Sequence, residues 1–313
     1  PNAGTAGQYI ILNGSVSTAP DETSLANNSK VTIVPTPIAA PPSFALNLKV
    51  MLQGALLGTT DGLMRDNLRS QNLIPLTSPY DATLAARFTR VAETSVAQTT
   101  NAVLAANAGT PNAIVDWVFI EIRDGASAST VVKTISALVQ RDGDIVSPNG
   151  TPLSVVIPAG NYFVSVKHRN HLGAMISNTV TFSGLGVTVD FTNLTNAQLY
   201  NNAGYDGAEM ATVGNVKALW LGNCNGDNKT KYDGAATDRT KIASDVLGSS
   251  ANTSASYVFN NAFGYFFGDV NMDGKAKYDG IGNDRLIIQQ TIQTYPLNTT
   301  LSNNYNNMLE QLP

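Results

Sequence analysis

Two polar loops in the last third of the sequence carry the residue types that bind a hard cation. Residues 222–239 (GNCNGDNKTKYDGAATDR) align with residues 268–285 (GDVNMDGKAKYDGIGNDR) at an offset of 46, with ten of 18 positions identical. The second loop follows the pattern D-x-N-x-D-G, which begins an EF-hand-like calcium loop. Because Ca²⁺ takes six to eight oxygen ligands, alternate side chains of such a loop can converge on one ion.

The repeat predicts two sets of calcium ligands. Position 7 contributes a main-chain carbonyl, so a lysine there can point its side chain to water. Position 12, the usual place of the closing acid, is Gly280, and the acid four residues later is expected to close the loop instead. The expected ligands of the second loop are Asp269, Asn271, Asp273, the carbonyl of Lys275 and Asp284, with Asp279 as second choice for closure. Those of the first loop are Asn223, Asn225, Asp227, the carbonyl of Lys229 and Asp238, with Asp233 as second choice.

The first loop is expected to bind calcium more weakly. Asn223 stands where the second loop has an aspartate, so the site loses one negative charge, and Asn228 replaces the turn glycine. The duplication favours calcium over the alternative of two metal-free turns. A bound ion would act structurally, because a metal that binds only the folded state adds to its stability.

Short helices are expected after both loops. Apolar residues four apart, Ile242 with Val246 and Ile288 with Ile292, predict helices over residues 239–247 and 285–292.

The sequence between residues 43 and 203 has the pattern of a β-sandwich. Residues 114–123 (IVDWVFIEIR) form the clearest strand, and turn signals such as Asp142-Gly143 recur every 8–12 residues. The other expected strands cover residues 44–56, 131–140, 144–146, 153–157, 161–167, 179–182 and 186–191. Residues 82–106 fit a helix or a strand. The predicted fold class is mainly β, an Ig-like or transthyretin-like sandwich followed by a small duplicated calcium-loop region.

Residues 1–42 form the first of three predicted regions and resemble a tail. Residues 8–17 and 30–35 are apolar and β-branched, which predicts two strands, and residues 35–42 (PTPIAAPP) predict an extended linker. Such strands must pair with a sheet, in the same chain or in a neighbour. The other regions are residues 43–203, the sandwich, and 204–313, the calcium-loop region.

The composition excludes several classes of protein. Only 13% of the residues are charged and the formal net charge is −4, which argues against a nucleic-acid binder. No apolar run is long enough to span a membrane, and 43% hydrophobic content argues against disorder. A start at Pro1 without a signal peptide suggests a processed, secreted product, and a single cysteine, Cys224, cannot form an internal disulfide.

The calcium loops resemble those of dockerins and thrombospondin type-3 repeats. Residues 52–68, 73–80, 116–125, 137–146, 161–175, 268–285 and 311–313 further resemble secreted surface proteins of Bacteroidota labelled haemagglutinin-like or adhesin-like. This resemblance covers most of residues 45–313 and implies a cell-surface or extracellular location, without an established activity. Asn223 and Cys224 depart from the pattern, in which Asp and a Val-like residue are expected.

Catalysis has little support in the sequence. Neither a nucleophile elbow nor a phosphate-binding glycine motif is present, and His168 and His171 read as a hydrogen-bonded turn at a strand end. We therefore expect a non-enzymatic extracellular structural protein that forms a homo-oligomer, fibre or surface layer by adding its N-terminal strands to a neighbour. The alternatives are an adhesin or glycan-binding module and a dockerin-like accessory component of a secreted complex.

Overall fold

The computed structural model describes residues 9–12, 32–35, 40–80, 87–93, 95–184 and 186–313. The chain divides into two compact units, Pro1–Pro42 and Ser43–Pro313. Residues 204–313 therefore belong to the same unit as the strands that precede them. Within the described residues the fold is mainly β, with several antiparallel sheets.

The first unit contains one two-stranded antiparallel sheet. Strand β1 (Tyr9–Leu12) pairs with β2 (Thr32–Pro35) along all four residues. Each of these strands pairs with the other, which is pairing within the same chain, one of the two expected possibilities; addition to a neighbouring subunit stays a prediction. The pairing satisfies only one edge of each strand, and β1 and β2 are the only described strands of this sheet.

The largest sheet of the second unit has the order β10-β8-β4-β5-β6, and β9 also pairs with β8. All its pairings are antiparallel. Its strands are β4 (Ile114–Asp124), β5 (Val131–Gln140), β6 (Ile145–Val146), β8 (Gly160–His168), β9 (His171–Met175) and β10 (Val180–Phe182).

A three-stranded sheet contributes to the same core. Its order is β11-β3-β7, with β11 (Gly186–Asp190) parallel and β7 (Ser154–Val156) antiparallel to the central β3 (Ser43–Lys49). The two sheets meet where Phe44 packs edge-on against Phe182, with ring centroids 5.9 Å apart. The specific type of sandwich stays a prediction.

Strand β4 is buried on both faces. Its first ten residues are all buried, although the alternation of side chains alone is compatible with one solvated face. As a consequence Asp116 and Glu121 lie inside the protein, where an ionised carboxylate needs charged or hydrogen-bonding partners.

The remaining elements are short. Helices α1 (Gln53–Leu56) and α2 (Asn67–Ser70) and the hairpin of β12 (Ala211–Val213) and β13 (Val216–Ala218) lie beside the sheets. The strand expected over residues 44–56 ends at Lys49, because Leu52 forms an isolated bridge with Leu219 and the chain then turns into α1. No helix in the described part of the chain has both the length and the apolar character needed to cross a bilayer.

The described part of the ambiguous segment 82–106 contains one short helix. Helix α3 (Asn101–Ala105) begins after Thr100, whose hydroxyl accepts a hydrogen bond from the Val103 amide. Residues 81–86 and 94 lie outside the described residues. A 3₁₀ turn, η2 (Asn196–Gln198), lies farther along the chain.

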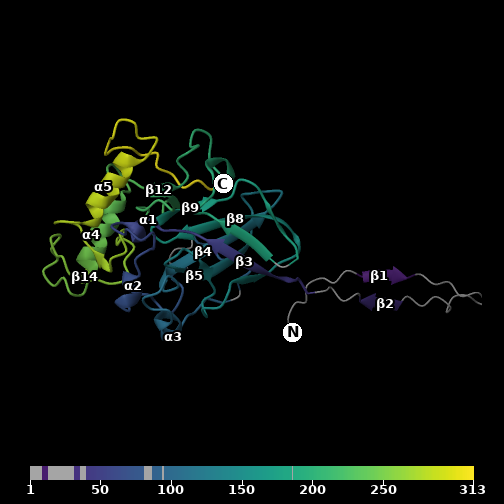
Figure 1. Cartoon of the computed structure of the whole chain (residues 1–313). Coiled ribbons are helices and arrows are strands. Elements are labelled where there is room, and N and C mark those ends of the chain that lie inside the picture. The colour runs from purple at the N-terminus through teal and green to yellow at the C-terminus, as the bar shows by residue number, and fades with distance from the viewer. Residues whose placement is uncertain (1–8, 13–31, 36–39, 81–86, 94, 185) are drawn as a thin grey trace, which may run out of the picture. The chain divides into compact units, whose positions relative to one another are not determined.

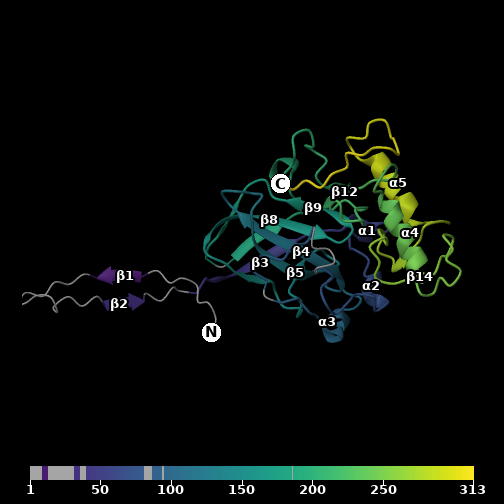
Figure 2. The same cartoon turned by 180° about the vertical axis from the view of Figure 1, so that it is seen from behind.

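Two helices follow the loops, as predicted from the repeat. Helices α4 (Asp238–Gly248) and α5 (Asp284–Thr294) lie side by side at one end of the second unit, while β3 begins at the opposite end (Figures 1 and 2). Their apolar residues Ile242, Ile288 and Ile292 share a small core with Trp220. The short strands β14 (Ala262–Phe263) and β15 (Lys275–Ala276) tie the second loop to the segment before it.

Truncation of Phe119 is expected to destabilise the second unit. Its ring is fully buried against Tyr80 and Phe88, so Phe119→Ala should lower the free energy of unfolding by about 3–5 kcal/mol. Urea denaturation measures the change. The control Ile281→Ala, at a side chain that is 96% exposed, should leave stability within about 0.5 kcal/mol of the parent. Equal effects of the two substitutions would contradict this assignment of the core.

Candidate metal centres

The second loop folds its side-chain oxygens onto its own main chain. The two carboxylate oxygens of the buried Asp269 accept hydrogen bonds from the amides of Asp273 (3.0 Å) and Gly274 (2.9 Å). Asn271 Oδ1 accepts from the Asp273 amide (3.0 Å), and Asp273 Oδ1 accepts from the Lys275 amide (3.0 Å). Gly274 has φ +92°, a left-handed conformation that the predicted turn requires. Positions 1, 3 and 5 are thereby held in one compact loop.

Asp284 reaches back to this loop from the first turn of α5. Its Oδ1 accepts from the Val270 amide (2.9 Å) and its Oδ2 from the Lys277 amide (2.8 Å). Oδ1 also accepts a longer hydrogen bond from the Asn271 amide (3.4 Å), whereas Oδ2 keeps a second lone pair that can bind a cation. Asp279, the second choice for closure, instead forms a half-exposed ion pair with Arg285 (3.2 Å).

The first loop repeats this arrangement. Asp238 accepts from the amides of Cys224 (2.8 Å) and Lys231 (2.7 Å), while Asp233 pairs with Arg239 (3.1 Å). Asn225 Oδ1 accepts from the Asp227 amide (3.1 Å), which continues the pattern of the second loop.

Asn223, position 1 of the first loop, has no hydrogen-bond partner. Its side chain is completely buried, and neither Oδ1 nor Nδ2 is hydrogen-bonded. A buried amide without a partner is costly, and a cation bound to its oxygen would satisfy half of it.

The lysines at position 7 direct their charge away from the loops. The ammonium group of Lys275 lies 4.5 Å from the centre of the Phe263 ring, and Lys229 is exposed. The amide of Lys229 donates to Asp227 (3.0 Å), as that of Lys275 donates to Asp273. Their main-chain carbonyls therefore remain the expected ligand atoms.

Burial shifts the pKa values of the loop carboxylates. It raises the pKa of Asp238 to about 7, with repulsion from Asp227 adding to the shift. Burial also raises the pKa of Asp269 to about 7, although Arg169 nearby opposes it. The pKa of Asp284 lies well above its usual range because of burial and the charge of Asp269. Because burial disfavours the ionised form of these carboxylates, a bound cation would stabilise that form strongly.

The donor set fits a hard cation better than a transition metal. Among the residues that the structure describes, no group of three or more His, Cys, Asp or Glu side chains is placed to hold a metal ion. Each loop instead offers a mixture of carboxylate, amide and main-chain carbonyl oxygens, which is the ligand chemistry of Ca²⁺. Cys224 is buried and its thiol donates to the Asp238 carbonyl, so it does not add a sulfur ligand.

The body of the protein holds the main chain of the second loop through three side chains. Arg65 donates to the Asn271 carbonyl (2.6 Å), Gln71 to the Asp273 carbonyl (2.8 Å) and Asn170 to the Asp269 carbonyl (2.8 Å). These contacts were not predicted, because the three residues precede the loop by about 100 to 206 positions and belong to no recognisable motif. They fix the loop against the sheet.

Asn170 belongs to a buried polar cluster in the turn between β8 and β9. Arg169 forms an ion pair with Asp116 of β4 (3.0 Å), stacks over the Tyr265 ring at 4.3 Å and donates to the Phe266 carbonyl. Burial would raise the pKa of Asp116, but Arg169 and His168 lower it to about 2. The cluster therefore joins the central strand to the segment that leads into the second loop.

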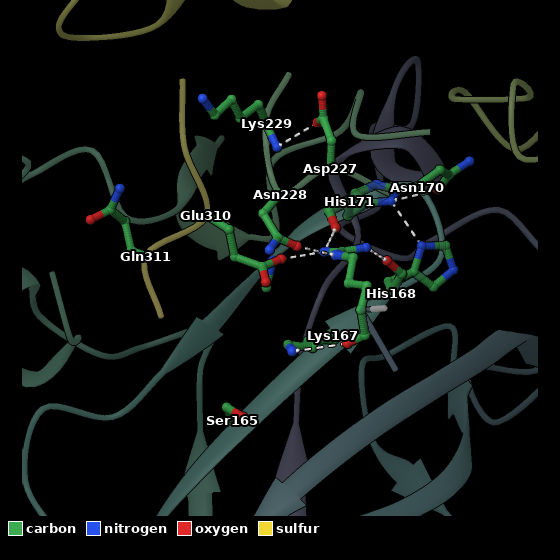
Figure 3. Close-up of polar contacts among 12 residues, drawn as sticks. Ser165, Lys167, His168, Asn170, His171, Asp227, Asn228, Lys229, Glu310 and Gln311 are labelled. Atoms are coloured by element: carbon green, nitrogen blue, oxygen red, sulfur yellow. Dashed lines mark hydrogen bonds and ion pairs between the residues drawn. The ribbon is translucent and has the colours of Figure 1, made fainter. Parts of the chain in front are cut away.

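The two histidines continue this cluster as a chain of hydrogen bonds. The Gly54 amide donates to His171 Nε2 (3.0 Å), the two Nδ1 atoms lie 2.9 Å apart, and His168 Nε2 lies 3.1 Å from Asp116. Figure 3 shows both rings and Asn170 directed toward one another. This chain of hydrogen bonds requires both imidazole rings to be neutral, with one proton on each. The pKa values agree with this requirement, because burial lowers the pKa of His168 and lowers that of His171 further.

A second buried ion pair connects the end of the sequence to the same turn. Arg87 pairs with Glu310 and donates to the carbonyls of His168 (2.7 Å) and His171 (2.6 Å). Its Nε also donates to Asn228 Oδ1 of the first loop (3.1 Å), near which Glu310 lies in Figure 3. Both loops are thus tied to the turn 168–171.

Replacement of the closing carboxylate is expected to abolish calcium-dependent stabilisation of the second loop. At calcium concentrations about 100-fold above the dissociation constant, one site adds about 2.7 kcal/mol. Asp284→Asn should lose this increment in a thermal melt with and without EGTA, because the amide removes a charged ligand. The matched control Asp279→Asn, in the same loop but paired with Arg285, should keep it. If both variants respond to EGTA as the parent does, Asp284 is not a ligand.

Acidification is expected to destabilise the protein through His171. Its pKa is lower in the folded state than the unfolded value of about 6.5, so the unfolded chain takes up a proton that the folded chain excludes. Below about pH 6.5 this residue should lower stability by about 1.4 kcal/mol per pH unit. Denaturation of the parent and His171→Gln between pH 7.5 and 5, both in saturating calcium, measures the difference. Parallel pH profiles would contradict the expectation.

No family model, curated protein or solved structure matches the chain. The resemblance to secreted surface proteins therefore stays an expectation.

Proposed function

We propose that the chain is an extracellular, calcium-stabilised structural subunit that assembles into a fibre or surface layer by adding its N-terminal strands to a neighbouring copy. The observation that carries this proposal is the separate unit Pro1–Pro42, whose described strands form a sheet of only two members. A two-stranded sheet is marginally stable in water. Its outer edges present unpaired amide and carbonyl groups that another sheet can complete.

The composition of the two strands supports the same proposal. The sequences YIIL and TIVP contain no charged residue, whereas exposed edge strands are commonly protected by lysine. A neighbour that accepts such a strand passes its own strand to the next copy. A head-to-tail contact of this kind produces an open polymer, not a closed dimer.

Calcium would serve this function by making the second unit rigid without disulfide bonds. The chain has one cysteine, and it is buried. Two ions in the loops 222–239 and 268–285 would stabilise the end of the unit that carries α4 and α5. The apolar residues of these helices pack inside the protein, which favours this structural role over a dockerin-like recognition surface.

Deletion of residues 1–34 is expected to leave a folded but non-assembling protein. The second unit keeps all its described strands, so its circular dichroism spectrum and its stability in calcium should match those of the parent. Sedimentation velocity and negative-stain electron microscopy should show polymers of the parent and monomers of the deletion variant.

A point substitution makes the same test without shortening the chain. Ile10→Pro removes one amide donor from β1 and should reduce assembly strongly, whereas Thr23→Pro, in the polar segment between the strands, should not. Normal elongation of the deletion variant would overturn the proposal.

A further inference from the structure

The second unit leaves two sheet edges open beside each other. Among the described strands, β10 at the end of the six-stranded sheet pairs only with β8. Likewise β11, at the end of the three-stranded sheet, pairs only with β3 among these strands. The two strands are neighbours in space as well as in sequence. They therefore border one seam between the sheets, to which no other described strand is paired.

The free edge of β11 presents the main chain of Thr188. The Phe191 amide donates to the Lys49 carbonyl. In this parallel pair the main-chain amide and carbonyl groups of the odd-numbered residues of β11 therefore point toward β3, and those of the even-numbered residues point away. The side chains follow the usual alternation, with Val187 and Val189 buried and Thr188 exposed. The Thr188 amide and carbonyl are thus directed toward the position of an added strand.

A groove of about 230 Å³ lies along this seam. Its apolar lining comes from both sheets and from the segment after β11, and its remaining lining residues are uncharged. The residues that matter here are Ile176, Val180, Thr188, Val189, Leu194 and Gln198. A strand that pairs with β11 would place alternate side chains in this groove, as in β-augmentation.

The chain itself contains a suitable strand. Strand β1 has four residues against the five of β11, it has no charged residue, and one of its edges is not used by β2. Strand β2 is less suitable because it ends in Pro35, which lacks an amide donor. An uncharged strand and an uncharged groove bury no unpaired charge when they associate.

We propose that the groove between β10 and β11 receives strand Tyr9–Leu12 of a second copy, which pairs with the free edge of β11. This inference rests on the proposed function and specifies its acceptor. The bond between copies is then a sheet ladder, with main-chain hydrogen bonds for affinity and the groove for register.

Two proline substitutions on the same sheet test the acceptor. Thr188→Pro removes the outward amide of β11, while Ser154→Pro removes an outward amide from β7, the other edge strand of that sheet. Both residues are exposed, and neither amide faces β3, so both variants should fold, as melting curves verify. Thr188→Pro should reduce polymer mass in sedimentation at least tenfold, and Ser154→Pro should leave it unchanged. The opposite pattern would overturn the proposal.

Disulfide trapping gives a second readout that does not depend on proline. Ile10→Cys and Thr188→Cys are prepared as separate proteins of different mass, mixed and oxidised; the native Cys224 is 1% exposed and should not react. A mixed disulfide dimer should form, and it should not form when Ser154→Cys replaces Thr188→Cys. A crosslink to position 154 but not to 188 would overturn the assignment of the acceptor.

These experiments separate the two proposals. If residues 1–34 are needed for assembly but Thr188→Pro assembles normally, the proposed function stands and the acceptor is wrong. If deletion of residues 1–34 has no effect on assembly, both are wrong.

Discussion

The second unit depends on the neutralisation of a carboxylate that lies inside its central strand. Asp116 is completely buried because β4 is covered on both faces, and Arg169, also completely buried, pairs with it. Loss of one partner of such a pair typically costs 3–5 kcal/mol, because the other charge stays buried. Arg169 also binds the segment that leads into the second loop, and the adjacent Asn170 binds the loop itself. The central strand and the second loop are therefore joined through this charge pair.

Buried polar groups of the loops and the edges of two strands lack partners among the described residues of a single chain. Asp269 and Asp284 are buried close to each other without enough positive charge to keep them ionised, and the Asn223 amide has no partner. Strands β1 and β11 each leave one edge unpaired by any described strand. The proposed calcium ion in each loop and the proposed second copy of the chain would supply these partners. This correspondence is the reason for proposing a calcium-stabilised, assembling subunit.

Local patterns were sufficient to predict most strands and both helices that follow the loops. Apolar residues four apart marked α4 and α5, and the alternating runs marked β4, β5 and β8. The cluster around Arg169 was not predictable, because its partners come from segments up to 149 residues apart along the sequence. For the same reason His168 and His171 were assigned to a turn, without the hydrogen-bond chain that joins them to Asp116. Strand β9 was missed because HLGAM lacks the β-branched, alternating pattern of a strand.

Native mass spectrometry of the full chain in dilute calcium tests the account most directly, because one spectrum reports both subunit number and bound ions. A calcium-stabilised, assembling subunit should give a series of oligomers at multiples of 33.0 kDa, each with two calcium ions per chain, and should lose the ions with EGTA. A spectrum that contains only the 33.0 kDa chain, without calcium, at concentrations where particles would otherwise form would contradict it.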